Sequence, residues 1–253
     1  VSHIKKALTK KTKAILPVHF AGFPLPMKEI VTFAKNKGLI VIDDACHALG
    51  AEYHYDGIVD KVGCSKYSDM TVLSFHPVKH ITTGEGGMVL LDDENLYHRL
   101  RAFRHHGITY PKEKQSAVGP WFYEIQNVGY NYRITDIQCA LGIEQMRRLD
   151  TFVKKRRFLA STYRQKLKNL EGIITITESS WSKSSYHLFP ILLDYQRKKT
   201  LPSRRWLFEA LRKENIGVQV HYIPIHFHPL YQKKFGYQPD TFRSAQMFYH
   251  SEI

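Results

Sequence analysis

The chain has 253 residues, of which 43% are hydrophobic and 24% charged, a balance that excludes a disordered protein. No apolar run reaches the roughly 18 residues that a membrane-spanning helix needs, and no signal peptide is recognisable. Three cysteines are too few for a disulfide scaffold, which favours a cytoplasmic protein.

The net charge of +14 suggests an anionic partner. The basic residues are spread over several runs, however, which is typical of solvated helix faces, and there is no zinc-finger or RNA-binding signature. We therefore expect neither nucleic acid nor a membrane as partner. The chain begins with Val1 and stops at FYHSEI, inside a predicted amphipathic helix, so we interpret it as part of a longer protein.

The first hundred residues predict alternating strands and helices. A continuous β-branched run at 39–43 predicts a strand covered on both faces, and Gly38 before it is placed to end a helix. The apolar patterns predict strands at 13–18, 39–43, 71–75 and 87–91, with helices at 27–37 and 96–103. Strands separated by helices indicate an α/β protein with a mostly parallel sheet.

The remaining sequence predicts a different pattern of elements. Residues 107–130 are expected to be irregular, and Thr135 with Gln138 forms a capping-box pattern that opens a helix to about residue 170. Beyond it we predict strands at 173–177, 186–193 and 216–223, and a helix at 204–215. This predicts a large domain at 1–150 and a smaller α+β domain at 151–253.

Two adjacent aspartates follow the strand at 39–43. The carboxyl ends of parallel strands are where such sheets bind ligands. Neighbouring side chains on a strand point to opposite faces, so we expect one of Asp43 and Asp44 to face a site and the other to cap the next turn. The alternative is that both act as caps. A buried carboxylate that stays ionised needs a cationic partner, such as the protonated ring nitrogen of a cofactor.

A lysine lies in the glycine-rich loop between the strands at 71–75 and 87–91. A lone lysine there is most often an ordinary surface residue, but Lys79 follows one strand where Asp44 follows another. Ser74, five residues earlier, is placed to bind an anion. A carboxylate for a pyridine nitrogen and a lysine for an aldehyde are what pyridoxal 5'-phosphate (PLP) requires, so we predict PLP as the cofactor.

Three segments then resemble the DegT–StrS family of PLP-dependent nucleotide-sugar aminotransferases. Residues 42–51 (IDDACHALGA) are similar to its E-D-x-A-[HQ]-A-x-G-A segment. Residues 74–90 are similar to S-F-x-x-x-K-x-x-x-x-G-E-G-G, and 127–142 to G-x-N-Y-R-x-[TS]-x-[IL]-Q-A-A-x-G. The resemblance covers the whole chain. It implies the type I PLP-dependent aminotransferase fold, with a mostly parallel seven-stranded sheet, a smaller α+β C-terminal domain, and the N-terminal part of the large domain missing.

The resemblance also implies roles for the cofactor residues. Lys79 binds PLP covalently and moves the substrate proton, and Asp44 keeps the ring nitrogen protonated. His47 contacts the ring hydroxyl, and Ser74 binds the cofactor phosphate. Asn131 reaches the phosphate of the neighbouring subunit's cofactor, because the family's sites are shared across a homodimer.

Other matched positions have weaker roles in the resemblance. Arg133 supports the contact made by Asn131 or binds substrate, and His221 and Tyr222 lie near the sugar nucleotide. Glu85 and Gly86 belong to the lysine segment without an assigned role.

The activity that the resemblance implies is transfer of an amino group from glutamate to a UDP-linked 4-keto-6-deoxy HexNAc, for surface glycan or flagellin sugar biosynthesis. Residues 217–231 and 121–138 most resemble the subgroup that makes UDP-4-amino-4,6-dideoxy-N-acetyl-β-L-altrosamine for pseudaminic acid. The phosphates of PLP and of a UDP-sugar would account for the positive charge.

Two other functions stay open. In the sugar dehydratases of the same fold a histidine replaces the lysine, whereas here Lys79 is aligned and His80 only follows it. A non-catalytic regulator that binds nucleic acid is supported by the charge alone.

We expect no metal site and no special role for the cysteines. His221, His226 and His228 lack the spacing of a zinc helix motif. Cys46 and Cys139 stand where relatives commonly have alanine, which predicts small buried residues.

Overall fold

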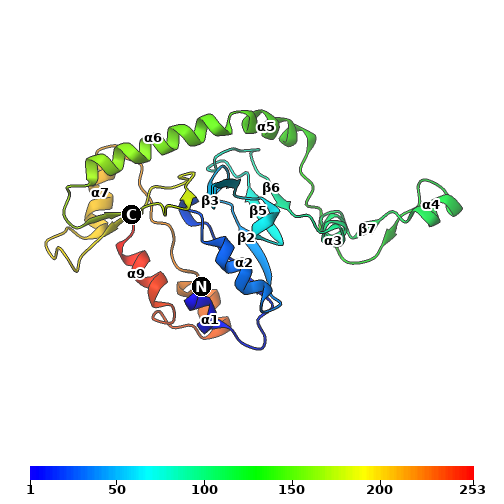
Figure 1. Cartoon of the computed structure of the whole chain (residues 1–253), viewed down its shortest axis with the longest axis horizontal. Helices are drawn as coiled ribbons and strands as arrows, with labels where there is room; N and C mark the ends of the chain where they lie inside the picture. Colours follow the sequence, from blue (N-terminus) through cyan, green and yellow to red (C-terminus); the bar gives the residue numbers. More distant parts are fainter. The chain divides into compact units, whose positions relative to one another are not determined.

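The computed structural model describes all 253 residues, which form two compact units (Figure 1). Unit 1 comprises residues 1–156 and 179–187, and unit 2 comprises 157–178 and 188–253. The division of the complete protein at residue 150 stays a prediction. None of the helices is long and apolar enough to cross a lipid bilayer.

Unit 1 is built on a four-stranded sheet with the order β1-β2-β5-β6. The strands β1 (Ala14–Ile15), β2 (Ile40–Asp44) and β5 (Met70–Ser74) are parallel, and β6 (Gly87–Leu90) is antiparallel to β5. All four predicted strands of this half are confirmed, although β1 is shorter than expected. Of the seven strands expected for the whole fold, the chain supplies these four in one sheet.

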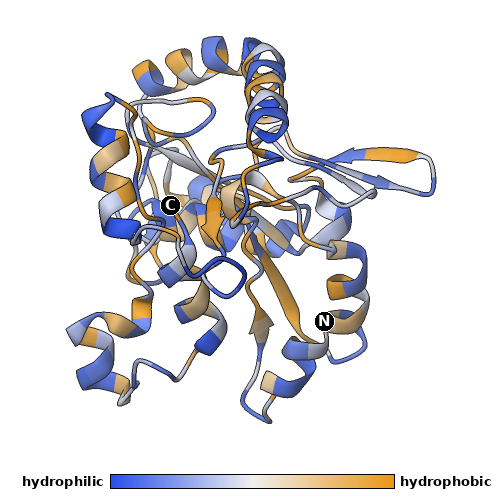
Figure 2. Ribbon diagram, turned by 90° about the vertical axis from the view of Figure 1, so that its left-hand side faces the viewer, coloured by the Kyte–Doolittle hydropathy of each residue, from blue (hydrophilic) through white to orange (hydrophobic).

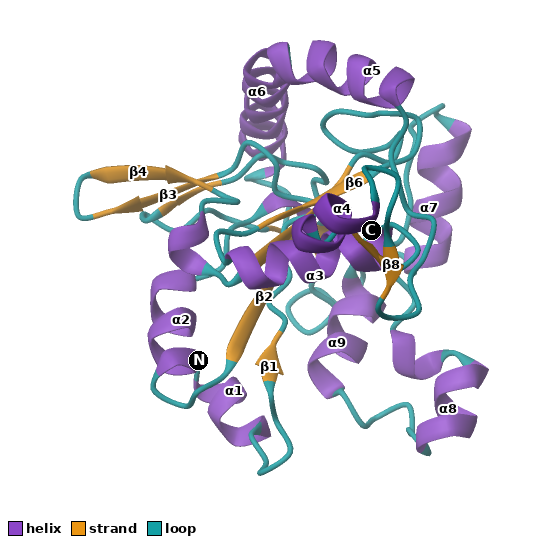
Figure 3. Ribbon diagram, turned by 90° about the vertical axis from the view of Figure 1, so that its right-hand side faces the viewer, coloured by secondary structure: helices purple, strands orange, loops and turns teal.

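Helix α2 (Met27–Lys35) covers one face of this sheet, as the views in Figures 1 and 3 agree. Its side chains at helical spacing, Met27, Ile30, Val31 and Ala34, are buried. Burial of each larger one contributes about 1.5–3 kcal/mol. After the helix the backbone reverses at Gly38, whose φ of +63° suits glycine, as predicted.

The prediction that β2 is covered on both faces is wrong for this chain. Val41 is 2% exposed but Ile40 is 44% exposed, and burial alternates along the strand. Helix α2 covers the side of Val41 and leaves the opposite side chains partly open. Figure 2 shows hydrophobic residues concentrated in the strands, while the helices carry both kinds.

A hairpin that the sequence reading missed lies between β2 and β5. Strands β3 (Glu52–Tyr55) and β4 (Ile58–Lys61) are joined by Asp56 and Gly57, both with positive φ. An Asp-Gly pair between alternating residues is a strong hairpin signal. Strand β10 (Ser182–Lys183) pairs with β3 on its other side.

The segment after β6 combines confirmed and unexpected elements. Helix α3 (Glu94–Arg104) forms as predicted, with the Asp93 side chain accepting the Leu96 N–H at its start. The stretch predicted to be irregular contains β7 (Ile108–Thr109), α4 (Lys112–Val118) and β8 (Glu124–Ile125). Strands of two residues are too short to produce a recognisable hydrophobic pattern.

The capping box is confirmed, but the long helix is two helices. Thr135 and Gln138 cap α5 (Asp136–Arg147), and α6 (Leu149–Leu167) follows. At Arg148 the N–H bonds to Gln145 and Met146 carbonyls and closes a tighter turn. The break brings Leu149 and Val153 into the core, where they are 9% and 3% exposed.

Unit 2 holds a small sheet and three helices. Strand β9 (Ile173–Thr175) pairs antiparallel with β11 (Ile191–Leu193). The helices are α7 (Arg204–Lys213), α8 (Pro229–Phe235) and α9 (Arg243–Ser251). The predicted strand at 173–177 and helix at 204–215 are confirmed. The remaining elements of the chain are α1 (Ser2–Ala7) and the short 3-10 helices at Phe20–Gly22, Ser65–Tyr67 and Ile225–Phe227.

Three predictions for this half are wrong. The strand expected at 186–193 forms only at Ile191–Leu193, because the residues before it bond within unit 1. No strand forms at 216–223, where the backbone N–H of His221 instead donates to the Glu252 carboxylate. The last helix ends at Ser251, and Ile253 pairs with the Ile191 backbone.

Candidate active site

The two aspartates at the end of β2 have different surroundings. Asp43 is 2% exposed, and its Oδ1 lies 2.9 Å from Nε2 of the buried His19, which also lies 2.9 Å from the Tyr53 hydroxyl. Asp44 is half-buried, and its Oδ1 accepts the Cys46 N–H at 3.1 Å. The prediction that one aspartate faces a site while the other caps the next turn is therefore wrong. Asp44 both caps the turn and stays partly accessible, and Asp43 is buried in the interior.

Lys79 follows β5, the neighbour of β2, and it is half-buried. Its amine makes no hydrogen bond and no ion pair. Burial lowers the pKa of Lys79, and the nearby negative charge of Asp44 opposes this shift. A half-buried, unpartnered amine with a lowered pKa is suited to attack a carbonyl carbon. The sheet thus brings the predicted nucleophile and the predicted carboxylate to one edge.

The cysteines differ from the expectation of small buried residues. Cys46 is half-buried, and burial together with the hydrogen bond to Asp44 raises its thiol pKa to about 12, so it stays protonated. Cys139 is exposed, because it lies on the side of α5 that faces an open apolar groove. Cys46 therefore supplies no thiolate near Lys79.

Hydrogen bonds to Phe75 close the loop that carries Lys79. The Phe75 N–H donates to the Gly86 carbonyl at 2.9 Å, and the Phe75 carbonyl accepts the Thr83 N–H at 3.0 Å and the Thr82 hydroxyl at 3.1 Å. Ser74 Oγ accepts the His76 N–H at 3.4 Å. We call residues 74–86 the Lys79 loop. Backbone and side-chain hydrogen bonds set its shape, and none of them uses the Lys79 amine.

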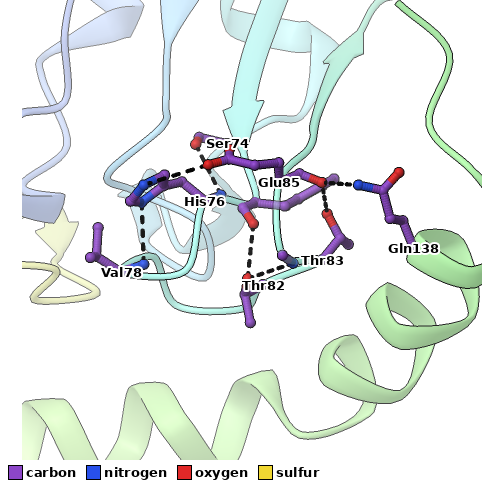
Figure 4. Close-up of polar contacts among 9 residues, drawn as sticks. Ser74, His76, Val78, Thr82, Thr83, Glu85 and Gln138 are labelled. Atoms are coloured by element: carbon purple, nitrogen blue, oxygen red, sulfur yellow. Dashed lines mark hydrogen bonds and ion pairs between the residues drawn. The ribbon is translucent and has the colours of Figure 1, made fainter.

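Glu85 and Gly86, which had no assigned role, shape this loop. The Glu85 carbonyl accepts the Thr83 hydroxyl at 2.7 Å and the Gln138 side-chain N–H at 2.8 Å (Figure 4). A Cβ at Gly86 would lie 2.3 Å from the Thr83 hydroxyl oxygen. A side chain at residue 86 would therefore displace the Thr83 hydroxyl from its hydrogen bond to Glu85.

His47 is held in one orientation beside this edge. Its Nδ1 accepts the Ala21 N–H at 3.3 Å, so the proton of the neutral ring is on Nε2. The Ser185 hydroxyl donates to the His47 carbonyl, and the His187 ring lies against its ring at 4.3 Å between centroids.

A buried group that the sequence reading missed supports His47. His80 donates from Nε2 to the Ser185 carbonyl at 3.1 Å, and burial followed by the charge of Arg156 lowers its pKa to about 4. Burial, then the charges of His47 and Lys79, lowers the pKa of His187 to about 2. Arg156 donates to the His187 carbonyl at 3.2 Å. The available signal was that the polar residues at 184–187 lead directly into the apolar run at 188–193.

Asn131 and Arg133 make their polar contacts with His105 and not with the Lys79 loop. Asn131 is bridged antiparallel to His105, and Arg133 Nη1 lies 3.0 Å from His105 Nδ1. Neither residue makes a hydrogen bond or ion pair with Ser74 or Lys79. The structure therefore brings together the predicted cofactor residues of β2 and the Lys79 loop, but not these two.

His221 and Tyr222 belong to unit 2. His221 Nδ1 lies 3.6 Å from the carboxylate of Glu252, which is 1% exposed, and the Tyr222 ring is largely exposed. His226 donates to the Pro239 carbonyl. The structure places no three His, Cys, Asp or Glu side chains where they could hold a metal ion.

An apolar groove in unit 1 does not mark the predicted site. It has a volume of about 910 Å³ and lies among apolar side chains of β5, β6, α3 and α5. None of the predicted cofactor residues lines it.

Comparison with known proteins decides the family. A model of the DegT/DnrJ/EryC1/StrS aminotransferase family matches residues 1–253. The chain belongs to this family. The family is PLP-dependent, and the α/β fold matches solved PLP aminotransferases, which confirms the fold predicted from sequence.

Individual relatives are similar over nearly the whole chain. An uncharacterised protein of Methanocaldococcus jannaschii is 44% identical over 100% of this chain and 64% of its own length. A UDP-4-amino-4,6-dideoxy-N-acetyl-β-L-altrosamine transaminase of Campylobacter jejuni is 40% identical over 95% of this chain and 59% of its own length. The solved Helicobacter pylori aminotransferase PseC is 33% identical with a TM-score of 0.86, over 99% of this chain and 62% of that one. The chain thus spans about 60% of the length of these relatives.

Proposed function

We propose that the complete protein is a PLP-dependent aminotransferase that moves an amino group from glutamate to a 4-keto-6-deoxy sugar nucleotide. The observation that carries this proposal is the unpartnered, half-buried amine of Lys79 beside the Asp44 carboxylate. These groups lie at the carboxyl ends of two adjacent parallel strands. This is the edge at which open α/β sheets bind ligands.

The residues present fit PLP. The cofactor supplies an aldehyde that binds amines and a pyridine ring that withdraws electrons when it is bound. The Asp44 carboxylate would hold the proton of the ring nitrogen, and neutral His47 would donate from Nε2 to the ring hydroxyl. The Ser74 hydroxyl is available for the phosphate. Each group is thus the chemical complement of one part of PLP.

Lys79 has two tasks in this function. Its amine would hold the cofactor aldehyde, and it would also accept and return the substrate proton at the carbon that carries nitrogen. A lowered pKa serves both tasks, because a larger fraction of the amine is then neutral at physiological pH.

Reduction with borohydride tests the cofactor and the nucleophile together. The complete protein is incubated with PLP, reduced, digested and analysed by mass spectrometry. We expect a pyridoxyl group on Lys79 and none on Lys66, an exposed lysine paired with Asp60. A folded protein that carries no label on Lys79 would refute the assignment.

The structure also bears on the dehydratase alternative, in which a histidine takes the place of the lysine. The adjacent His80 is 4% exposed, and it donates to the Ser185 carbonyl. It is therefore unsuited to replace Lys79 as the catalytic base. This supports transamination over dehydration.

For the substrate we propose a UDP-linked 4-keto-6-deoxy HexNAc, as in pseudaminic acid biosynthesis. The support is the similarity to transaminases of this specificity at 35–40% identity. Incubation with glutamate and a panel of UDP- and dTDP-linked 3-keto and 4-keto sugars, followed by mass spectrometry of the products, tests it. Amination of only a 3-keto or dTDP-linked sugar would contradict this choice.

We further propose that the complete protein is a homodimer in which Asn131 reaches the partner's cofactor phosphate. Support comes from the position of Asn131, which contacts His105 and not the phosphate-binding Ser74 of its own chain. Sedimentation of the complete protein tests the dimer.

A further inference from the structure

His187 is a buried histidine next to the proposed cofactor residues, and the proposed chemistry gives it no task. It is 7% exposed, and its Nδ1 is buried without a hydrogen-bond partner. Its ring centroid lies 4.3 Å from that of His47 and 5.6 Å from that of His80. A buried polar atom that makes no hydrogen bond is uncommon in folded proteins and calls for an explanation.

Three segments of the chain meet around His47. The Ala21 N–H donates to its Nδ1 at 3.3 Å, and the Ser185 hydroxyl donates to its carbonyl oxygen at 3.3 Å. The segments come closest at Gly22, where a Cβ would lie 2.9 Å from the His47 carbonyl oxygen and 2.9 Å from the His187 backbone nitrogen. The φ of Gly22 is +94°, which also favours glycine. This glycine therefore allows His187 to pack its ring against His47.

The packing restricts the rotation of the His47 ring. The Phe20 ring lies 6.0 Å from it at an angle of 48°, and the His187 ring lies 4.3 Å from it at an angle of 49°. Because Nδ1 of His47 accepts a hydrogen bond, the proton of the neutral ring is on Nε2. Without the His187 ring, His47 could turn about its side-chain bonds, and its Nε2–H would lose its fixed direction.

His187 contributes this packing as a neutral ring. The titratable and charged groups that face it are His47, Lys79, His80 and Arg156. Burial, followed by the charges of these groups, lowers the pKa of His187 to about 2. A neutral ring adds no charge beside His47. Since its Nδ1 bonds to nothing, the contribution of His187 is its shape and not a hydrogen bond from this nitrogen.

We propose that His187 is a positioning residue, which holds the His47 ring so that its Nε2–H donates to the ring hydroxyl of PLP. The inference rests on the proposed function, because it requires PLP at this edge of the sheet. A donated hydrogen bond stabilises the ring oxygen in its ionised form. The proton on the linkage between PLP and Lys79 is otherwise shared with that oxygen. The hydrogen bond from His47 therefore lowers the pH at which the linkage loses its proton.

The absorbance of the complete protein loaded with PLP, measured as a function of pH, tests the inference, because protonation of the linkage changes its absorption spectrum. In His187→Ala we expect the midpoint of this titration to rise by about one pH unit and the affinity for PLP to fall about tenfold, through loss of one hydrogen bond. His187→Phe keeps a ring and should restore both values. The control His226→Ala removes a buried histidine ring of unit 2 and should leave the midpoint unchanged.

A double-mutant cycle shows whether His187 acts through His47. In the His47→Ala background, the further change His187→Ala should not move the midpoint. An additional rise in that background would show that His187 acts on Lys79 by another route, and it would overturn the inference. A wild-type midpoint in His187→Ala, or a raised midpoint in His187→Phe, would overturn it as well.

Borohydride labelling separates this inference from the proposed function. A label on Lys79 together with an unchanged midpoint in His187→Ala refutes the positioning role alone. A wild-type protein without a label on Lys79 refutes the proposed function, and the inference fails with it. Circular dichroism checks the folding of each variant. If His187→Ala does not fold, His187→Leu takes its place, because it fills the space without a flat ring and should still raise the midpoint.

Discussion

The Lys79 loop and the segment 130–133 both belong to specific sequence motifs, but they differ in how far the chain buries their side chains. In the Lys79 loop, His80 and Ile81 are 4% and 1% exposed, and several side chains bond to the backbone. In segment 130–133, the backbone is bonded to the end of α3, but Tyr130 and Tyr132 are 47% and 69% exposed. The buried side chains of the Lys79 loop thus find their contacts within the same chain. The second presents side chains that its own chain does not cover, as expected for a surface that meets a ligand or a partner.

The largest expected effect is the loss of turnover in the Lys79→Ala variant, which tests the role of the Lys79 loop. We expect turnover to fall by at least about 10²–10⁴-fold, the usual contribution of a positioned acid–base group, with little change in stability because Lys79 is half-buried and unpartnered.

The turnover of the Asn131→Ala variant should also fall. When Lys79→Ala and Asn131→Ala proteins are unfolded and refolded together, activity should return, since mixed dimers contain one intact site. Mixtures as inactive as the parents would show that both residues serve the same chain's site.

A smaller effect concerns the packing of the Lys79 loop. Gly86→Ala places a Cβ against the Thr83 hydroxyl, so we expect a loss of about 1–3 kcal/mol in unfolding free energy. Urea denaturation measures it. Gly217→Ala is the matched control, because its Cβ would meet no atom within 4 Å, and it should change stability by less than about 0.5 kcal/mol. Similar losses in both variants would mean that the loop tolerates the extra atom.

A further effect of similar size is a pH dependence from the buried histidines. The pKa values of His80 and His187 are lowered to about 4 and about 2 from 6.5, so the unfolded chain binds protons first on acidification. Their contribution is complete above about pH 6.5 and is lost as the pH falls toward these folded-state values. Between pH 6.5 and 5 each should cost about 2 kcal/mol. The groups that face His187 are His47, Lys79, His80 and Arg156.

Urea denaturation at both pH values checks this. The stability difference between pH 6.5 and 5 should be smaller by about 2 kcal/mol in His187→Gln than in the wild type. His98→Gln, an exposed position on α3, should leave the difference unchanged. Equal pH dependence in all three proteins would show that His187 is not kept neutral.

The sequence predicted the parts of the fold and site that depend on local pattern. The four strands of the main sheet, the capping box at Thr135 and the placement of Asp44 and Lys79 at one sheet edge follow from periodicity, turn chemistry and a specific motif. The β3–β4 hairpin was also predictable, because its Asp-Gly turn is visible in the sequence.

Other features depend on contacts between distant residues and have no local pattern. The burial of Asp43 requires His19, and the packing of His47 requires His187, which is 140 residues away. The missing strand at 216–223 has good β-propensity but no neighbouring strand to pair with, and propensity alone does not supply one. The pocket of about 730 Å³ beside the end of α3 likewise assembles Arg101, Lys112 and Arg133 from three segments, and each of these residues reads as an ordinary surface charge in the sequence.

Gln138 has a consequence beyond capping its helix. Its side-chain oxygen accepts the Thr135 N–H at 3.0 Å, while its side-chain nitrogen donates to the Glu85 carbonyl at 2.8 Å. One amide group therefore fastens the first turn of α5 to the Lys79 loop. Because Thr135 follows Arg133 by only two residues, this one side chain joins the segment that carries Arg133 to the loop that carries Lys79.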